Sequence, residues 1–242
     1  EVIQQSHAIQ LLSQDSWALW EPDSYEFLVL LFAALLAQKQ VLLPPNRVSD
    51  LEKELAEQNI LFLQRQPILA TADPQLELNL DDVFLNQAQL YFYTSGSTGQ
   101  PKKIPRTLRQ LLNEVQGLDA SFQLPEQAIA IATVSHQHIY GLLFKLLWPL
   151  ASGRCFYQTQ LAFPEDVADI QKKLAPLNIE NYVISSPALL KRWTPDVRLQ
   201  HCLSVYSSGG KLESGVRPYL NRPIHEVFGS SDTGGIAHRQ QD

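Results

Sequence analysis

The sequence predicts an α/β fold made of two lobes, each a mostly parallel sheet covered by helices. Short runs rich in β-branched or aromatic residues alternate with helix-length segments along the 242 residues. Parallel strands need long crossover connections, which are usually helices lying on both faces of the sheet. A break at Pro125 marks the expected boundary, so that the first lobe covers 1–124 and the second 125–242.

The first lobe opens with a helix that is apolar on nearly every face, which indicates a buried helix. A short strand follows, and Pro44 stops it. Ser49 and Glu52 have the spacing of a capping box, and Thr107 is placed to cap the last helix of the lobe. The expected elements are a helix over 24–38, a strand over 41–43, a helix from 49 to about 58, strands over 60–63 and 90–93, and a helix from 107 to about 122.

The second lobe continues the same alternation after Pro125. Its apolar runs are short enough for buried strands, and the segments between them have helix length. The expected elements are a strand over 128–134, a helix over 142–150, a strand over 155–157, a helix over 164–174, a strand over 182–185, a helix over 187–193, and strands over 203–206 and 224–228.

Charge and hydropathy exclude several classes of protein. The net charge is −6 and no run of Lys or Arg occurs, which argues against nucleic acid as a partner. The longest apolar run, 27–37, is about half as long as a membrane-spanning helix of ~20 residues. The start of the chain lacks a signal-peptide pattern. We therefore expect a cytoplasmic protein with no membrane insertion.

The two cysteines, Cys155 and Cys202, lie far apart and match no Cys-x-x-Cys pattern. This spacing predicts two reduced, buried thiols and no disulfide or zinc site. His136 and His138 are two residues apart, but no acidic or Cys partner is near them in sequence, so zinc is not predicted there either.

The most informative segment is YTSGSTGQPK at 93–102. Its glycines allow a tight turn with inward-pointing N–H groups, its hydroxyls add donors, and a Lys closes it, so it can cradle phosphate oxygens. It is not a Walker A loop, because Pro101 separates Gly99 from Lys102. A polar turn without a ligand is the alternative for a bare Gly-Ser-Thr-Gly.

The full string resembles the phosphate-binding loop of adenylate-forming enzymes, a superfamily of acyl-CoA synthetases, aryl ligases, luciferases and nonribosomal adenylation domains. Three further segments resemble motifs of that superfamily in the same order. They are SHQHIYGL at 135–142, similar to the His-x-x-Gly segment of the acyl pocket, SGGKL at 208–212, similar to the turn on the adenine, and FGSSDTGG at 228–235, similar to Tyr-Gly-x-Thr-Glu. The continuation IAHRQ resembles bacterial AMP-ligases of fatty-acid-like or aryl-polyene synthesis.

The resemblance implies the large N-terminal domain of such an enzyme and its reaction. A carboxylate attacks the α-phosphate of ATP, pyrophosphate leaves, and the acyl-adenylate then passes its acyl group to a thiol of CoA or of an acyl carrier protein. The implied catalytic residues are Lys102, His138 and Ser231, and the implied ligand of Mg²⁺ is Asp232. The implied ATP-binding residues are Thr94, Ser95, Gly96, Ser97, Thr98, Gly99, Lys102, Gly209, Gly210, Phe228, Gly229 and Ser231.

Several positions depart from the superfamily pattern. Asp232 stands where the pattern has Glu, one methylene longer, and Phe228 stands where it has Tyr. These departures leave open a noncatalytic relative that binds a nucleotide or an acyl group as a regulatory module. A solvated Lys102 and a core position for His138 are the plain structural alternatives, and a structural or interaction domain with a coincidental loop is the remaining class.

The printed chain ends at Asp242, before the segment and the small C-terminal lid that follow these motifs in the superfamily. The resemblance therefore implies an incomplete N-terminal domain. We expect the chain by itself to bind ATP weakly and not to complete adenylation, because ribose anchoring and lid closure need those later residues.

Overall fold

The computed structural model describes residues 1–67, 80–95, 101–213, 215 and 217–241. It divides into two compact units, Glu1–Asn113 and Glu114–Asp242. Each unit contains one sheet of five strands, in which four strands run parallel and the fifth, at one edge, is antiparallel. The α/β class with two mostly parallel sheets is thus confirmed.

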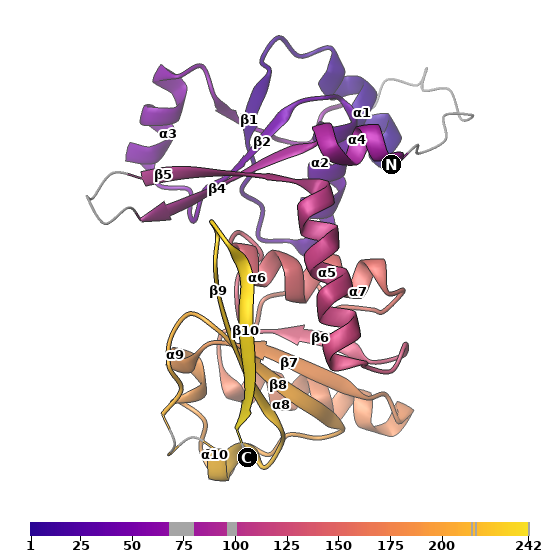
Figure 1. Cartoon of the computed structure of the whole chain (residues 1–242), viewed down its shortest axis with the longest axis vertical. Helices are drawn as coiled ribbons and strands as arrows, with labels where there is room; N and C mark the ends of the chain where they lie inside the picture. The colour runs from indigo at the N-terminus through magenta and orange to yellow at the C-terminus, as the bar shows by residue number, and fades with distance from the viewer. Residues whose placement is uncertain (68–79, 96–100, 214, 216, 242) are drawn as a thin grey trace. The chain divides into compact units, whose positions relative to one another are not determined.

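The first unit has the strand order β3-β1-β2-β4-β5 (Figure 1). Only the pair β4 and β5 is antiparallel in this sheet. The elements are α1 (Val2–Gln10), β1 (Ser16–Ala18), α2 (Ser24–Leu36), β2 (Gln40–Leu43), α3 (Ser49–Glu57), β3 (Leu61–Phe62), α4 (Asp82–Gln87), β4 (Gln89–Ser95) and β5 (Pro101–Thr107).

Helix α2 forms as the apolar run predicts. The Asp23 side chain accepts hydrogen bonds from the backbone N–H of Tyr25 and of Glu26, which caps the first turn. Phe27, Leu31 and other large side chains of α2 are fully buried. A helix that is buried on nearly every side needs no polar face, which explains its composition.

The capping box predicted at Ser49 is wrong. Val48 is the N-cap of α3, and no side chain caps this helix. Glu52 instead accepts a hydrogen bond from the Nε of Arg47. The carboxylate therefore has a partner outside the helix and does not reach back to the cap.

The cap predicted at Thr107 is confirmed. Helix α5 (Leu108–Phe122) follows β5 directly, and the Thr107 hydroxyl accepts a hydrogen bond from the backbone N–H of Gln110 at 3.1 Å. The Gln110 side chain accepts the N–H of Thr107 in return, at 3.0 Å. This reciprocal pair is a complete capping box at the start of α5.

The second unit begins within α5 and has the strand order β10-β9-β8-β7-β6 (Figure 1). Only β9 and β10 pair in antiparallel fashion. The further elements are β6 (Ile129–Ala132), α6 (Ile139–Gly141), the π-helix η1 (Leu142–Leu147), α7 (Trp148–Ala151), α8 (Pro164–Leu174), the 3₁₀ turn η2 (Ala175–Leu177), β7 (Asn181–Ser185), α9 (Pro187–Leu190), β8 (Cys202–Ser207), α10 (Arg217–Leu220), β9 (Ile224–Ser230) and β10 (Gly234–Gln241).

Two sequence expectations in this unit need correction. The helix expected over 142–150 has a π-helical middle, η1, between short α-helical turns. The strand expected over 155–157 is a single parallel bridge between Ala130 and Phe156. Cys155 in that segment is exposed, contrary to the prediction of a buried thiol, whereas Cys202 is buried and burial raises its pKa to about 12.

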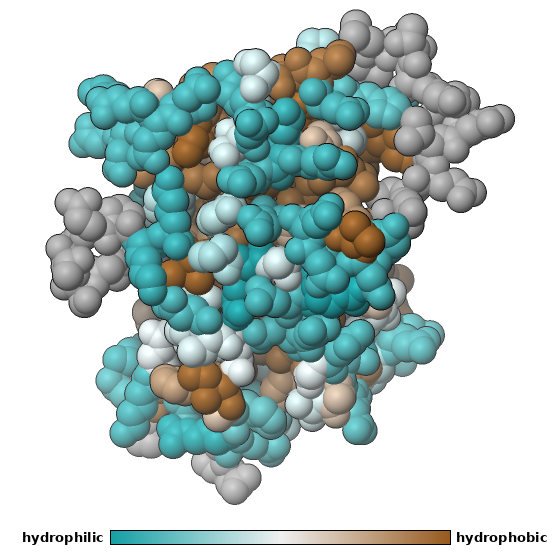
Figure 2. Space-filling view, turned by 45° about the horizontal axis from the view of Figure 1, so that its top comes forward, coloured by the Kyte–Doolittle hydropathy of each residue, from teal (hydrophilic) through white to brown (hydrophobic). Residues whose placement is uncertain are grey.

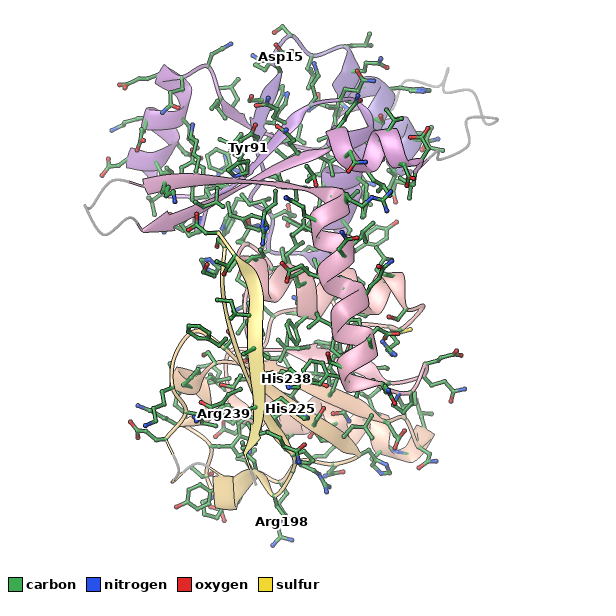
Figure 3. The ribbon with its side chains drawn as sticks, viewed as in Figure 1. Asp15, Tyr91, Arg198, His225, His238 and Arg239 are labelled. Carbon is green, nitrogen blue, oxygen red and sulfur yellow. The ribbon has the colours of Figure 1, made fainter. Side chains whose placement is uncertain are left out.

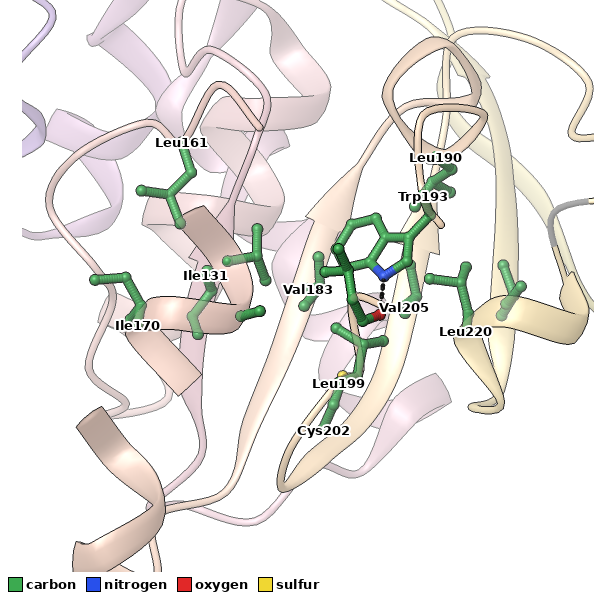
Figure 4. Close-up of a cluster of buried hydrophobic side chains, with 14 of the residues drawn as sticks. Ile131, Leu161, Ile170, Val183, Leu190, Trp193, Leu199, Cys202, Val205 and Leu220 are labelled. Atoms are coloured by element: carbon green, nitrogen blue, oxygen red, sulfur yellow. Dashed lines mark hydrogen bonds between the residues drawn. The ribbon is translucent and has the colours of Figure 1, made fainter. Parts of the chain in front are cut away.

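One hydrophobic core of the second unit lies among β6, β7, β8, α8 and α9 (Figure 4). Val183, Leu190 and Val205 in it are fully buried. The indole N–H of Trp193 donates a hydrogen bond to the backbone oxygen of Val197 at 2.8 Å. The large ring is therefore buried without leaving its polar atom unpaired.

The turn from α5 to β6 is held by a buried arginine. The guanidinium of Arg154 donates to the backbone oxygens of Leu124 and Pro125 and to the carboxylate of Asp119. The same carboxylate accepts the indole N–H of Trp148, and these donors lower the pKa of Asp119. The chain around Pro125 is thus anchored by several charge-assisted bonds.

The surface is mixed in polarity. On the face shown in Figure 2, apolar side chains form separate areas among polar ones. Across the described residues, no helix combines the length and the apolar composition that a bilayer crossing requires.

Candidate nucleotide-binding site

The predicted phosphate loop connects β4 to β5. Gly96, Ser97, Thr98 and Gly99 lie outside the described residues. The flanking backbone pairs in register, with Thr94 opposite Lys102 and Ser95 opposite Pro101. The segment is therefore the connection of an antiparallel hairpin, which brings its two ends together.

Two lysines follow the loop on β5, and both are exposed. The ammonium of Lys103 donates to the side-chain oxygen of Gln58 at 2.8 Å and lies 5.8 Å from the ring centre of Tyr93. Neighbouring residues of a strand point to opposite faces, so Lys102 lies on the other face of β5.

A cavity of about 620 Å³ lies in the second unit, between the turn after β8 and the pair β9 and β10. It brings together Gly209, Gly210, Phe228 and Gly229, which come from two separate motifs. The ring of Phe228 is 67% exposed, so it is available to a ligand and is not a core aromatic. The cavity is lined by Ser208, Gly209, Gly210, Lys211, Glu226, Val227, Phe228, Gly229, Ala237, His238 and Arg239.

The turn over this cavity depends on a glycine and a carboxylate. Gly209 has a φ of +93°, a conformation that strongly favours glycine. The Glu226 side chain accepts the backbone N–H of Leu212 at 2.8 Å and the Nε of Arg239 at 2.7 Å. Glu226 therefore holds the end of the turn and the Arg239 side chain at the same edge of the cavity, and sequence reasoning missed this role.

Ser231 and Asp232 occupy the turn between β9 and β10. Ser231 is half-buried and Asp232 is exposed. The Ser230 hydroxyl accepts the backbone N–H of Thr233 at 3.1 Å, and the two hydroxyls lie 2.9 Å apart. These bonds close the turn and present Ser231 and Asp232 at its tip.

The strand pair is tied to α5 close to this turn. The backbone N–H of Gly235 donates to Oε2 of Glu114 at 2.7 Å. The pairing of β9 with β10 shifts register between Gly235 and Ala237, which marks a β-bulge at Ile236. The sequence carried no signal for this contact, because its partners are 121 positions apart.

His138 is the N-cap residue of α6 and is exposed. Its pKa is lowered because the surrounding protein desolvates the imidazole. Gly141, the last residue of the His-x-x-Gly segment, is required sterically, because a Cβ there would lie 2.0 Å from the backbone oxygen of Ser135. His136 is buried, and among the described residues no group of three or more His, Cys, Asp or Glu side chains comes together as a metal site.

An aromatic cluster borders the cavity from the interior. His225 stacks on Tyr206 with ring centres 5.2 Å apart, and Phe122 lies 5.0 Å from His225 and 4.8 Å from His238. Figure 3 shows His225, His238 and Arg239 along β9 and β10. Burial, and secondarily the charge of His238, lower the pKa of His225.

The structure therefore brings Gly209, Gly210, Phe228 and Gly229 to one cavity, and places Ser231 and Asp232 at the tip of the strand pair that lines it. Thr94, Ser95 and Lys102 belong to the other unit.

A protein-family model described as AMP-binding enzyme matches residues 42–242. The chain belongs to this family. The resemblance to adenylate-forming enzymes read from the four motifs is thereby confirmed.

Curated relatives within the family share short or partial stretches with the chain. The 4-coumarate–CoA ligase of Rhodobacter capsulatus is 29% identical over 159 residues, which are 63% of this chain and 40% of that protein. The medium-chain-fatty-acid–[acyl-carrier-protein] ligase JamA of Moorena producens is 36% identical over 72 residues, 29% of this chain and 12% of that protein. The chain thus corresponds to less than half of the length of each.

Solved structures of family members share the fold. A malonyl-CoA ligase with methylmalonyl-CoA and AMP bound matches 98% of this chain and 55% of its own, with a TM-score of 0.76 and 18% identity. The N-terminal subdomain of Klebsiella oxytoca NpsA, in complex with 3-hydroxyanthranilyl-AMSN, matches 100% of this chain and 68% of its own, with a TM-score of 0.73 and 16% identity. Identities this low show the fold alone.

Proposed function

We propose that the intact protein activates a carboxylic acid with ATP and transfers the acyl group to a thiol. A carboxylate oxygen attacks the α-phosphorus, the bond to the pyrophosphate breaks, and pyrophosphate leaves with an acyl-adenylate formed. The thiol of CoA or of an acyl carrier protein then displaces AMP. The observation that carries this proposal is the cavity that joins the Gly209 turn to Phe228 and Gly229 in a chain of this family.

We assign the adenine to this cavity. The exposed ring of Phe228 offers a flat apolar face for a base, and Gly209 and Gly210 allow the backbone to come close to it. The residues of the loop after β4, together with Lys102, hold the phosphates through N–H groups, hydroxyls and one positive charge. His138 borders the acyl group, and the Ser231 hydroxyl meets the α-phosphate or the incoming carboxylate.

Asp232 fits a Mg²⁺ site by its chemistry. Asp232 is exposed in the turn that also contains Ser231, and both side chains carry oxygen donors. Mg²⁺ is bound in proteins by one or two carboxylates and keeps several waters, so the shorter Asp side chain suffices through a water. Asp232 would hold the ion from the protein side, and the ion would supply positive charge to the phosphates.

The acid and the acceptor are assigned by class only. The names of two relatives point to an aryl acid with CoA and to a medium-chain fatty acid with an acyl carrier protein. We propose a reaction in the cytoplasm, without a nucleic-acid partner. The departures at Phe228 and Asp232 favour one alternative, a noncatalytic module that binds a nucleotide or an acyl group.

The test is carboxylate-dependent exchange of labelled pyrophosphate into ATP by the intact protein, with 4-coumarate and medium-chain acids in the panel. We expect exchange with at least one acid and a loss of about 10- to 100-fold in Asp232→Ala, because an outer metal partner is removed. The exposed Asp196, outside the cavity, gives the control Asp196→Ala, which should exchange normally. No exchange with any acid by folded protein would favour the noncatalytic module.

A further inference from the structure

Glu114 joins helix α5 to the strand pair that carries Ser231 and Asp232. Its Oε2 accepts the backbone N–H of Gly235 at 2.7 Å. A carboxylate that accepts from a backbone N–H makes a charge-assisted bond, stronger than a neutral one. A Cβ at position 235 would lie 3.3 Å from Oε2 of Glu114, which is a tight contact. Glycine at this position therefore leaves room for the carboxylate beside the amide.

The bond between Glu114 and Gly235 lies close to the turn between β9 and β10, where it can affect the position of that turn. Gly235 pairs with Gly229, the next pair joins Ala237 to Phe228, and Ile236 is the extra residue of the bulge. A bulge interrupts the ladder, bends the strand and re-aims the residues beside it. Glu114 therefore bonds to the backbone directly beside the interruption of the ladder.

The segment between Gly229 and Gly235 is closed by its own contacts. A Cβ on Gly229 would lie 2.4 Å from the backbone oxygen of Gly234, so the strands approach closely there. The bonds between Ser230 and Thr233 close the turn above. These contacts hold the turn to the strand residues beside it, so a bond at Gly235 bears on the position of the turn that carries Ser231 and Asp232.

We infer that Glu114 is a positioning residue, which sets the position of the turn that carries Ser231 and Asp232, and with it the Mg²⁺ affinity of the Asp232 carboxylate. This inference rests on the proposed function for its consequence, but the bond itself is a property of the second unit. The conservative variant Glu114→Gln keeps an oxygen acceptor for Gly235 and loses the charge, whereas Glu114→Ala removes the acceptor.

The experiment compares Glu114→Ala, Glu114→Gln and the control Gln116→Ala, an exposed position of the same helix, in the intact protein. The first readout is hydrogen exchange of the Gly235 amide by NMR. We expect exchange to be about tenfold faster in Glu114→Ala, with recovery in Glu114→Gln and no change in the control. An unchanged Gly235 amide in Glu114→Ala would overturn the bond, whether or not the protein is active.

The second readout is the Mg²⁺ dependence of pyrophosphate exchange, measured below the unfolding temperature of every variant. We expect the Mg²⁺ concentration for half-maximal rate to rise about tenfold in Glu114→Ala and to recover largely in Glu114→Gln. A purely structural role would lower thermal stability and leave the Mg²⁺ dependence as in wild type, which would overturn the positioning role. If the wild-type protein exchanges no pyrophosphate, the proposed function is refuted. The hydrogen exchange of the Gly235 amide then still tests the bond to Glu114.

Discussion

At the scale of single residues, two motif glycines are required for steric reasons, which the motif pattern by itself does not show. Gly141 and Gly229 each approach a backbone oxygen so closely that a Cβ would lie 2.0 Å and 2.4 Å away, respectively. Contacts under 3.0 Å force a shift of the backbone. Both glycines therefore maintain the backbone of a motif and do not by themselves identify a ligand contact.

His225 gives a prediction at the same scale. Burial lowers its pKa in the folded protein, whereas the unfolded chain binds a proton on this imidazole below about pH 6.5. The unfolded state then binds more protons than the folded one, so the free energy of unfolding falls as the pH drops through this window. We expect His225→Phe, which keeps an aromatic ring against Tyr206, to flatten this dependence.

The measurement is urea unfolding of wild type and His225→Phe between about pH 7.5 and pH 5.5. The two proteins differ only at position 225, so a difference in slope reports the His225 imidazole together with its interaction with His238. Equal slopes in the two proteins would contradict a lowered pKa at this residue.

At the scale of elements, the two predicted helix caps had opposite outcomes. Both Ser49 with Glu52 and Thr107 with Gln110 have the spacing of a capping box. Only Thr107 and Gln110 form it, because α3 begins at Ser49 with Val48 as its N-cap, so Ser49 is not in the cap position. The two sequence patterns were similar, and the residue at which each helix begins decided the result.

This contrast predicts different costs for two similar substitutions. Thr107→Ala leaves the N–H of Gln110 without its acceptor and should lower the free energy of unfolding by about 1 kcal/mol. Ser49→Ala removes no cap and should change it by less than about 0.5 kcal/mol. Chemical denaturation with circular dichroism measures both, and equal losses would refute the assignment of the caps.

At the scale of the whole molecule, each unit has its own sheet and its own buried cluster. Ala18, Leu42 and Leu55 belong to a cluster of the first unit, and Val183 and Leu190 to one of the second. Units with separate cores unfold as separate cooperative units by default.

Leu190→Ala tests this separation. The side chain is fully buried, so its truncation should cost about 2–5 kcal/mol in the second unit. Hydrogen exchange should speed up in β6 to β9 and change far less in β2 and β4. Leu150→Ala, at a leucine of the same unit that is 47% exposed, serves as the control. Equal loss of protection in all strands would show one cooperative unit instead.

Much of the fold was predictable because buried strands and helices carry their own pattern. Helix α8 has the predicted bounds, and α2 differs by two residues at its end. Three strands were missed: the short interior strand β1, which has only three residues, and the strands β5 and β10, which are different in kind. Strands β5 and β10 are antiparallel edge strands, and β5 contains Pro101 and Pro105, which edges tolerate. Strands of this composition form through their partners, so local pattern does not show them.

The sequence by itself determined the α/β class, the order of four motifs and, through them, the family, since these depend on residues close together in the chain. Only the tertiary structure decided that Phe228 is exposed in a cavity with Gly209, that Glu226 bonds to Arg239, and that Glu114 bonds to Gly235. These contacts join strands, turns and a helix that are distant in sequence. Their geometry follows from strand pairing and a bulge, which no local pattern of residues encodes.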